Sequence, residues 1–458
     1  MRAAPLRGQL TAQLAALRAR EVSAAELVDD AVARIERLDP PLNAVVVRDV
    51  DRARAAARLA DQARARGDSR PLLGVPLTVK EAIDVAGLPT TWGRPGDGPA
   101  ATHDAVLVRR LKAAGAIVLG KTNVATMLAD WQTANPVYGV TNNPWDRSRT
   151  PGGSSGGAAA AVAAGLTPLE FGSDLAGSLR IPASFCGVFA HRPSFGLVPM
   201  RGFAPPGAPR DDIGSPVDQS VLGPMARSAA DLMLALDAVA GPDADDAVAY
   251  QLRLPPPRAE SLRAFRVLVV DTHPLVPTAE SVRGALATLA DELTRAGCTV
   301  GREDPELPDF REVSALFRDL LSAFMSVDAS GPSMSHRDWV QADRRRFALA
   351  ARWRRLFERW DVVLTPTAPT TAFPHDERPF HRRTLDVDGH AVPYELLPLW
   401  TALPTPTGHP AATMPIGRDA AGLPIGVQII GPRLEDRTPI AFAAVVEELR
   451  GGFVPPPA

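Results

Sequence analysis

Three separate segments carry side chains suited to acyl-transfer chemistry. Ser154 lies between two glycine pairs in GGSSGG (152–157), Ser178 lies in FGSDLAGSLRIP (171–182), and Lys80 stands upstream of both. A serine hydroxyl is a weak nucleophile until a base accepts its proton, and a neutral lysine amine is such a base. The small residues at 175–178 favour a turn whose backbone N–H groups point into one concavity, which suits an oxyanion.

Lysine is rare in this chain, which makes each lysine a candidate for chemistry. Of the 50 lysine and arginine residues, only Lys80, Lys112 and Lys121 are lysines. Arginine stays protonated in proteins, whereas a lysine removed from water can become a neutral amine. A coding bias toward arginine, alanine and proline explains the ratio as well, so rarity alone assigns no role.

The glycine-rich segment by itself is open to three interpretations: a phosphate-binding loop, a flexible linker or a catalytic loop. It lacks the Gly-Lys-Ser/Thr ending of a phosphate-binding loop. No serine stands three residues before a lysine, which argues against the penicillin-binding class. The eight histidines are scattered, so neither a metal site nor a Ser-His-Asp triad is predicted. Taken singly, a Gly/Ser segment is usually only a loop, and a lysine near a strand end usually reaches water.

The elements that must hold these segments alternate between strand and helix. SAAE (23–26) is a capping box that begins an amphipathic helix ending before Pro40, and an Ala/Arg-rich helix is predicted over about 51–66. Hydrophobic runs and periodicity predict a strand-rich run holding Lys80, strands at 116–123, 266–271, 361–366 and 426–431, and helices at 104–114, 156–165 and 279–296. This alternation predicts an α/β fold with a central mixed, mostly parallel β-sheet flanked by helices on both faces.

Composition and charge limit the classes of function. The 458 residues are enough for a large core, and with a formal net charge of −2 no global basic field indicates a nucleic-acid partner. No stretch is long enough and apolar enough to span a bilayer, so no membrane partner is expected. Cys186 and Cys298 form neither a disulfide framework nor a metal cluster, which favours a reducing cytoplasm.

Several segments together resemble the amidase signature family of serine hydrolases. The matching stretches are GVPLTVKEAIDVAGLPTTWG (74–93), GKTN (120–123), NPVYGVTNNPWDRSRTPGGSSGG (135–157), the signature itself (150–182), GPMARSAADLMLALDAVAGPD (223–243) and GLPIGVQIIGP (422–432). The resemblance covers nearly the whole chain and implies a single amidase domain over 1–458. Within it we expect an N-terminal helical region (1–66), a signature core (67–245) and a helical lobe (305–360) packed on the core.

The resemblance implies a role for each of the three candidates. Lys80 matches the family's base, Ser178 its nucleophile, and Ser154 the serine between them, which a cis peptide bond precedes in the family. In that mechanism neutral Lys80 takes a proton from Ser154, and Ser154 takes one from Ser178, whose oxygen attacks a carboxylic amide. Water then releases the acyl-enzyme, and no metal or organic cofactor is implied.

Further residues receive supporting roles from the same resemblance. The expected oxyanion-hole donors are the N–H groups of Leu175, Ala176 and Gly177, the expected supporting residues are Gly153, Ser155, Asp174 and Arg180, and the expected acyl-pocket residues are Met127 and Trp131. The loop 201–212 and Trp400 are weaker candidates for the pocket. Ala176 departs from the glycine that the family usually has there, and its methyl group is expected to narrow the pocket.

Two rival functions stay open at this stage. One is the A subunit of a tRNA-dependent amidotransferase, which needs partner chains. The other is a non-catalytic family member that acts as a binding protein. The main expectation is an amidase acting on a small-molecule amide, and because dimers are common in the family, a homodimer is the expected alternative to a monomer.

Overall fold

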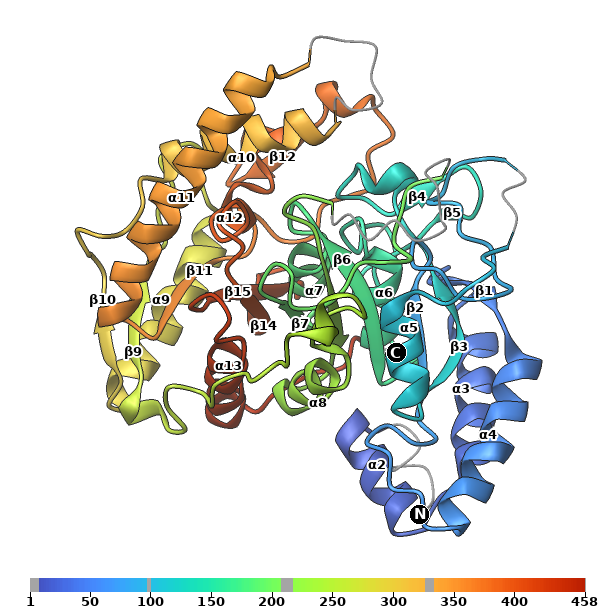
Figure 1. The fold of residues 1–458 in the computed structure, drawn as a ribbon. Helices are drawn as coiled ribbons and strands as arrows, with labels where there is room; N and C mark the ends of the chain where they lie inside the picture. The colour runs from blue at the N-terminus through green and yellow to red at the C-terminus, as the bar shows by residue number, and fades with distance from the viewer. Residues whose placement is uncertain (1–7, 97–99, 207–216, 326–332, 458) are drawn as a thin grey trace.

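A mixed β-sheet forms the centre of the molecule in the computed structural model, which describes residues 8–96, 100–206, 217–325 and 333–457 (Figure 1). Within these residues the sheet has 11 strands in the order β1-β3-β2-β6-β8-β7-β14-β15-β11-β9-β10. The strands are β1 (Val45–Arg48), β2 (Pro76–Lys80), β3 (Ile117–Thr122), β6 (Leu169–Asp174), β7 (Phe189–Arg192), β8 (Val221–Ala226), β9 (Arg266–Val269), β10 (Thr299–Gly301), β11 (Val362–Pro366), β14 (Ala411–Arg418) and β15 (Pro424–Ile430). Two small ribbons add β4 (Ala134–Asn135) with β5 (Gly139–Val140), and β12 (Thr384–Val387) with β13 (His390–Pro393).

The pairing of the strands corrects one expectation. Parallel pairs join β3, β2 and β6 on one side and β11, β9 and β10 on the other. Every pair from β6 across to β11 is antiparallel, and so is the edge pair β1–β3. The sheet is mixed, as predicted, but the predicted excess of parallel pairs is wrong. The central strand β8 contains Gly223 and Pro224, which are depleted in strands, so the sequence pattern passes over it.

Helices cover both faces of this sheet. They are α2 (Leu10–Arg18), α3 (Ala24–Leu38), α4 (Val50–Ala65), α5 (Val106–Ala113), α6 (Gly156–Ala163), α7 (Arg180–Cys186), α8 (Ala229–Val239), α9 (Glu280–Arg295), α10 (Phe310–Met325), α11 (His336–Arg359), α12 (Leu399–Ala402) and α13 (Arg437–Arg450). All residues of β2, β6, β8 and β15 are buried, which requires cover on both sides. The α/β class with flanking helices is therefore confirmed.

Local sequence signals explain several of these elements. The predicted capping box is present: the Ser23 side chain accepts from the Glu26 N–H, and α3 ends at Leu38. The predicted helix 156–165 is α6, whose residues are all buried because alanine and glycine let it lie against the sheet. The chain needs glycine here, since a Cβ on Gly157 would lie 2.4 Å from the Asn123 backbone nitrogen.

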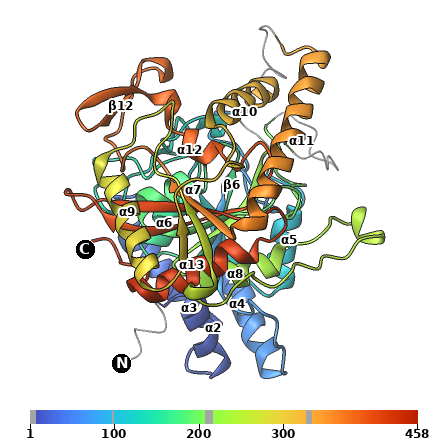
Figure 2. The same ribbon diagram turned by 90° about the vertical axis from the view of Figure 1, so that its left-hand side faces the viewer.

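Helices α10 and α11 lie on the opposite side of the molecule from the N-terminal helices α2, α3 and α4. In both views α10 and α11 stand at the top of the molecule, and α2, α3 and α4 stand at the bottom (Figures 1 and 2). Helices α10 and α11 occupy the segment 305–360, and Trp353 of α11 is fully buried while Trp339 is 40% exposed. None of the helices in the described ranges is long and apolar enough to cross a membrane.

Candidate active site

Lys80, the last residue of β2, points into a buried cluster of hydroxyl groups. Its Nζ lies 2.7 Å from Ser154 Oγ, 2.8 Å from Ser155 Oγ and 2.9 Å from Ser173 Oγ. These partners are 74 to 93 residues away in the chain. The structure thus brings Lys80 and Ser154 together, and it adds Ser173, which the sequence analysis did not single out. Ser173 comes from β6, the parallel neighbour of β2.

The three hydroxyl partners of Nζ fit both protonation states of the amine. A neutral amine donates two hydrogen bonds and accepts one, whereas an ammonium group donates three. The Ser155 hydroxyl already donates to the Ser173 carbonyl at 3.2 Å, so it accepts from Lys80. A neutral Lys80 would therefore accept its one hydrogen bond from the hydroxyl of Ser154 or of Ser173. Ser154 is the closer of these two residues.

Burial sets the protonation of three groups around this cluster. It lowers the pKa of Lys80 to about 7, although the charges of Asp174 and Glu170 oppose the change. It raises the pKa of Glu170, a fully buried residue on β6, to about 8. Burial also acts to raise the pKa of Asp174, but the cation of Arg180 outweighs it and lowers that pKa to about 2. Near neutral pH the site therefore holds a largely neutral Glu170, an ionised Asp174 and a lysine that gives up its proton readily.

The GGSSGG loop is a rigid, buried part of this site. The Gly153–Ser154 peptide bond is cis, and residues 151–157 are all buried. A Cβ on Gly153 would lie 2.6 Å from the Asp130 carbonyl oxygen, so only glycine fits. The linker interpretation is therefore wrong. Gly153 packs against the backbone of residues 130–132, and the contact of Ser154 with Lys80 supports the catalytic interpretation.

A second glycine-containing segment of the chain matches the phosphate-loop consensus. GAIVLGKT (115–122) has the required spacing, but Ile117–Thr122 form strand β3. Lys121 is buried and donates to the Thr90 hydroxyl at 2.8 Å. The match is therefore structural, because a phosphate loop needs free N–H groups between a strand and a helix.

The turn that carries Ser178 is fixed by a buried ion pair. Asp174 accepts from the N–H groups of Gly177 (3.0 Å) and Leu179 (3.1 Å). It also pairs with Arg180, whose Nε and Nη2 lie 2.9 and 2.7 Å from its two oxygens. Arg180 in turn donates to Gln428 Oε1 at 2.5 Å, which ties the turn to β15. Asp174 and Arg180 therefore lie where supporting residues are needed.

The same contacts occupy one of the expected oxyanion donors. The Gly177 N–H is directed at Asp174, so it is not a free donor for an oxyanion. Across the described residues, the N–H groups of Leu175, Ala176 and Ser178 make no hydrogen bond, and these are the donors left for an oxyanion. The Gly177 N–H therefore holds the shape of the turn, and the oxyanion role of the Leu175 and Ala176 N–H groups stays a proposal.

Ser178 and Ser154 line the same cavity. The Ser155 N–H donates to the Ser178 carbonyl at 3.3 Å, which joins the two loops. In the described part of the chain no hydrogen bond joins the Ser154 and Ser178 hydroxyls. Catalytic contacts are often long in a ligand-free site and shorten when substrate binds.

The cavity above these serines has a volume of about 190 Å³ and a mostly apolar lining. Its lining residues are Trp92, Met127, Leu128, Ala129, Asp130, Trp131, Ser154, Ser173, Leu175, Ala176, Ser178, Phe203, Val217, Ser220, Leu321, Phe324, Met325 and Phe380. Met127 and Trp131 therefore lie where the sequence placed them. Met127 and Leu128 have φ angles of 52° and 59°, a left-handed conformation that is rare outside glycine and concentrates at functional sites.

Other expected pocket residues have different outcomes. Phe203 of the loop 201–212 lines the cavity, but residues 207–212 lie outside the described residues. Trp400 is fully buried and donates to Thr278, so it belongs to the core and not to the cavity. The Ala176 side chain lines the cavity, as its expected narrowing role requires.

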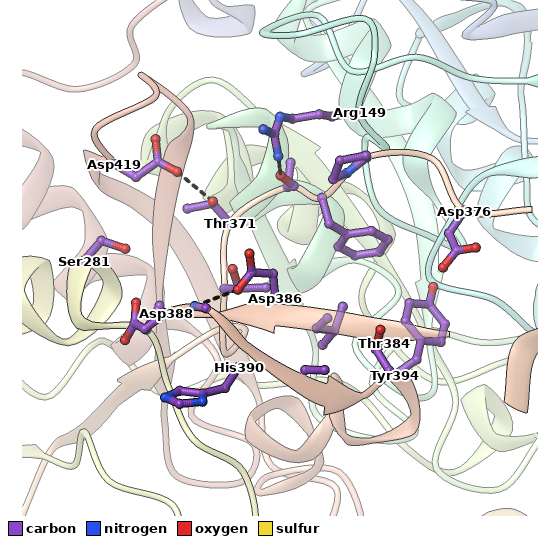
Figure 3. A pocket seen from close by; sticks show the side chains of 18 of the residues that line it. Arg149, Ser281, Thr371, Asp376, Thr384, Asp386, Asp388, His390, Tyr394 and Asp419 are labelled. Atoms are coloured by element: carbon purple, nitrogen blue, oxygen red, sulfur yellow. Dashed lines mark hydrogen bonds between the residues drawn. The ribbon is translucent and has the colours of Figure 1, made fainter. Parts of the chain in front are cut away.

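A second and larger cavity of about 720 Å³ lies near the β12–β13 ribbon, away from the serines (Figure 3). Four aspartates line it, and their carboxylates have partners: Asp419 accepts from Thr371, Asp386 from the Gly389 N–H, Asp388 from the Glu280 N–H, and Asp376 pairs with Arg378. These carboxylates hold turns together. Tyr394 lines this larger cavity, and its ring packs against Trp131, which lines the smaller cavity above the serines.

Comparisons with known proteins agree with this geometry. The family model described as Amidase matches residues 26–336 and 327–439. The chain is 38% identical over 456 residues to “Putative amidase AmiB2” of Mycobacterium bovis, covering 94% of this chain and 93% of that protein. It is 34% identical over 487 residues to the A subunit of the glutamyl-tRNA(Gln) amidotransferase of Deinococcus radiodurans, covering 96% and 97%. A solved bacterial aryl acylamidase of the amidase signature family superposes with a TM-score of 0.82 at 25% identity, over 97% of both chains. The chain belongs to the amidase signature family.

Proposed function

We propose that this chain hydrolyses a carboxylic amide through a covalent acyl-enzyme on Ser178, with Ser154 and neutral Lys80 as the proton relay. One observation carries the proposal: the buried Lys80 Nζ lies 2.7 Å from Ser154 Oγ, and Ser154 shares a cavity with Ser178. A lysine with a pKa of about 7 is a base matched to neutral pH.

The proton steps balance without any external acid or base. Lys80 accepts the Ser154 proton, Ser154 accepts the Ser178 proton, and the Ser178 oxygen attacks the amide carbonyl carbon. When the tetrahedral intermediate collapses, the C–N bond breaks and the leaving nitrogen takes a proton back through Ser154 from Lys80. Water then repeats the attack on the ester, which releases the acid and restores Ser178.

The negative charge of the intermediate needs donors next to Ser178. The N–H groups of Leu175, Ala176 and Ser178 are unbonded within the described residues and border the cavity. Removing a single oxyanion donor in comparable enzymes costs about 3–4 kcal/mol of transition-state stabilisation. Ala176 would therefore contribute to catalysis through its backbone N–H group.

The pKa of Lys80 predicts how activity depends on pH. Protonated Lys80 cannot accept the Ser154 proton, so kcat/KM should fall as pH drops below about 7 and level off above it. The measurement is kcat/KM on a neutral amide without titratable groups, from about pH 5 to about pH 9, because kcat/KM reports the free enzyme. A flat profile across pH 7, or one that falls as pH rises through 7, would contradict a lysine base.

The cavity indicates a small, uncharged substrate with an apolar group. Its volume of about 190 Å³ is below the ~300–1,000 Å³ of sites for drug-sized ligands. Asp130 is the one charged side chain among the described lining residues, and its carboxylate already accepts from Arg383 and from the Tyr394 hydroxyl. An apolar acyl group would pack against Met127 and Trp131, and a charged group would find no partner.

This substrate class separates the proposal from the amidotransferase alternative. The similarity to the A subunit of an amidotransferase favours glutamine as a second candidate substrate. Glutamine carries an ammonium and a carboxylate group, which need charged partners. We expect the purified chain to hydrolyse small aryl and branched aliphatic amides at least about tenfold faster, in kcat/KM, than glutamine. Glutaminase activity that appears only with co-purifying chains would support the alternative.

A binding protein without catalysis is the remaining alternative. A fluorophosphonate reacts only with an activated serine, so labelling of Ser178 in folded protein would exclude it. The homodimer and the cytoplasmic location stay predictions, which size measurement of the purified chain and fractionation of cells would test.

A further inference from the structure

The peptide between Ala176 and Gly177 is held at both of its polar ends. The Ala176 carbonyl accepts from Trp131 Nε1 at 2.9 Å, and the Gly177 N–H donates to Asp174 Oδ1 at 3.0 Å. A peptide unit is planar, so two such bonds in opposite directions fix its orientation. The N–H groups of Ala176 and Ser178, two of the three proposed oxyanion donors, belong to the peptide planes on either side, so this anchor limits how far they can turn.

Trp131 joins this peptide to the apolar cavity. One part of its indole lines the cavity, while its N–H points at the loop that carries the nucleophile. A buried indole N–H usually has a hydrogen-bond partner, and here that partner is a carbonyl of the loop that carries the nucleophile. The contact therefore links substrate binding to the donors next to Ser178.

The indole itself is held in place by residues from a distant segment. Its ring packs against Phe380 and Tyr394, with ring centroids 5.7 and 5.6 Å away. The preceding residue, Asp130, accepts from the Tyr394 hydroxyl at 2.7 Å and from Arg383 at 2.5 Å. Figure 3 shows Tyr394 at one end of the larger cavity, which it lines. These contacts pre-organise the N–H of Trp131 toward Ala176.

We propose that Trp131 is a positioning residue for the oxyanion loop, and that its indole N–H, through the Ala176 carbonyl, sets the direction of the N–H donors beside Ser178. The proposal rests on the proposed amide hydrolysis at this site. It assigns Trp131 an effect on the chemical step, beyond the acyl-pocket role that the family resemblance implies.

The test removes the indole N–H and keeps an aromatic ring. For Trp131→Phe we expect kcat on a neutral apolar amide to fall about 10- to 100-fold, with KM changed less than about threefold, because a misplaced donor weakens the transition state more than the ground state. Phe380→Leu is the matched control, because Phe380 lines the same cavity and touches the same ring but makes no hydrogen bond to the loop. This variant keeps the indole N–H and only loosens the packing of the ring, so its main effect should be on KM and its loss of kcat should be smaller than that of Trp131→Phe.

Two further measurements separate the possible outcomes. The rate of fluorophosphonate labelling at Ser178 should fall in Trp131→Phe in parallel with kcat, because the phosphoryl oxygen occupies the same donors. Trp131→3-benzothienylalanine keeps the indole shape without the N–H, so it must reproduce the loss of kcat even if Trp131→Phe is less stable. A change confined to KM, or unchanged labelling in both variants, would overturn the inference. Failure of the wild-type chain to label would instead sink the proposed function.

Discussion

Replacing Ser178 with alanine is expected to abolish turnover, with kcat falling by about 10⁴-fold or more, because the acyl group then has no oxygen to bond to. Ser178 is 6% exposed and lines the cavity, so removing its hydroxyl disturbs little packing. The measurement is steady-state hydrolysis of a small apolar amide. Mass spectrometry of the intact chain should show an acyl adduct in the wild type during turnover and none in Ser178→Ala.

Ser155→Ala is the control for Ser178→Ala, because it removes a serine hydroxyl of the same site that is not the nucleophile. Ser155 contacts the same lysine at 2.8 Å, but its hydroxyl proton is directed at the Ser173 carbonyl. Its loss should lower kcat by about 10- to 100-fold, since it orients Lys80 and takes no proton. If Ser178→Ala keeps turnover and fluorophosphonate labels Ser154, the nucleophile has been assigned to the wrong serine.

The residue types of the relay were predictable, but the way they meet was not. A sequence pattern can show that Lys80, Ser154 and Ser178 carry suitable groups, because each lies in a segment with its own signature. That they meet follows from the placement of β2 beside β6, with Thr78 opposite Glu170. Register between distant strands is set by packing over the whole sheet, which no local pattern carries.

The cavity shows a stronger limit of sequence reasoning. Trp92, Phe203, Leu321 and Phe380 come from four separate segments, and each has the same residue type as an ordinary core residue. No rule of sequence spacing distinguishes these residues from core residues, because what they share is the cavity that they line. Met127 and Trp131 were expected because the family resemblance implies that their segment lines the acyl pocket. The partner of the Gly177 N–H was likewise out of reach, since it depends on how one turn closes on Asp174.

The bounds of helices, unlike the cavity, could be predicted from local sequence signals. Helix α3 begins and ends where its capping box and its prolines place it, since these signals act within one turn of the chain. The central strand β8 was missed because Gly223 and Pro224 lower its strand propensity, and tertiary packing on both sides outweighs that preference. Local rules thus described the periphery of the fold better than its centre.

Lys80→Arg is expected to be as damaging as Lys80→Met, with kcat lower by about 10³-fold or more in both, because a guanidinium stays protonated and cannot accept the Ser154 proton. The wild-type lysine has a pKa of about 7 through burial, and no comparable burial makes arginine a base near neutral pH. Lys112→Arg is the matched control: Lys112 is 41% exposed and pairs with Asp104 on the surface, so the charge is kept and activity should be unchanged.

Chemical rescue separates a missing base from a damaged fold. In Lys80→Ala, small primary amines should restore part of the turnover, in proportion to the concentration of their neutral form, because a free amine can take the place of Nζ beside Ser154. The restored rate should therefore rise with pH toward the pKa of the added amine. Near-normal turnover of Lys80→Arg, or rescue that follows the ammonium form, would show that Lys80 acts as a fixed positive charge and not as the base of the relay.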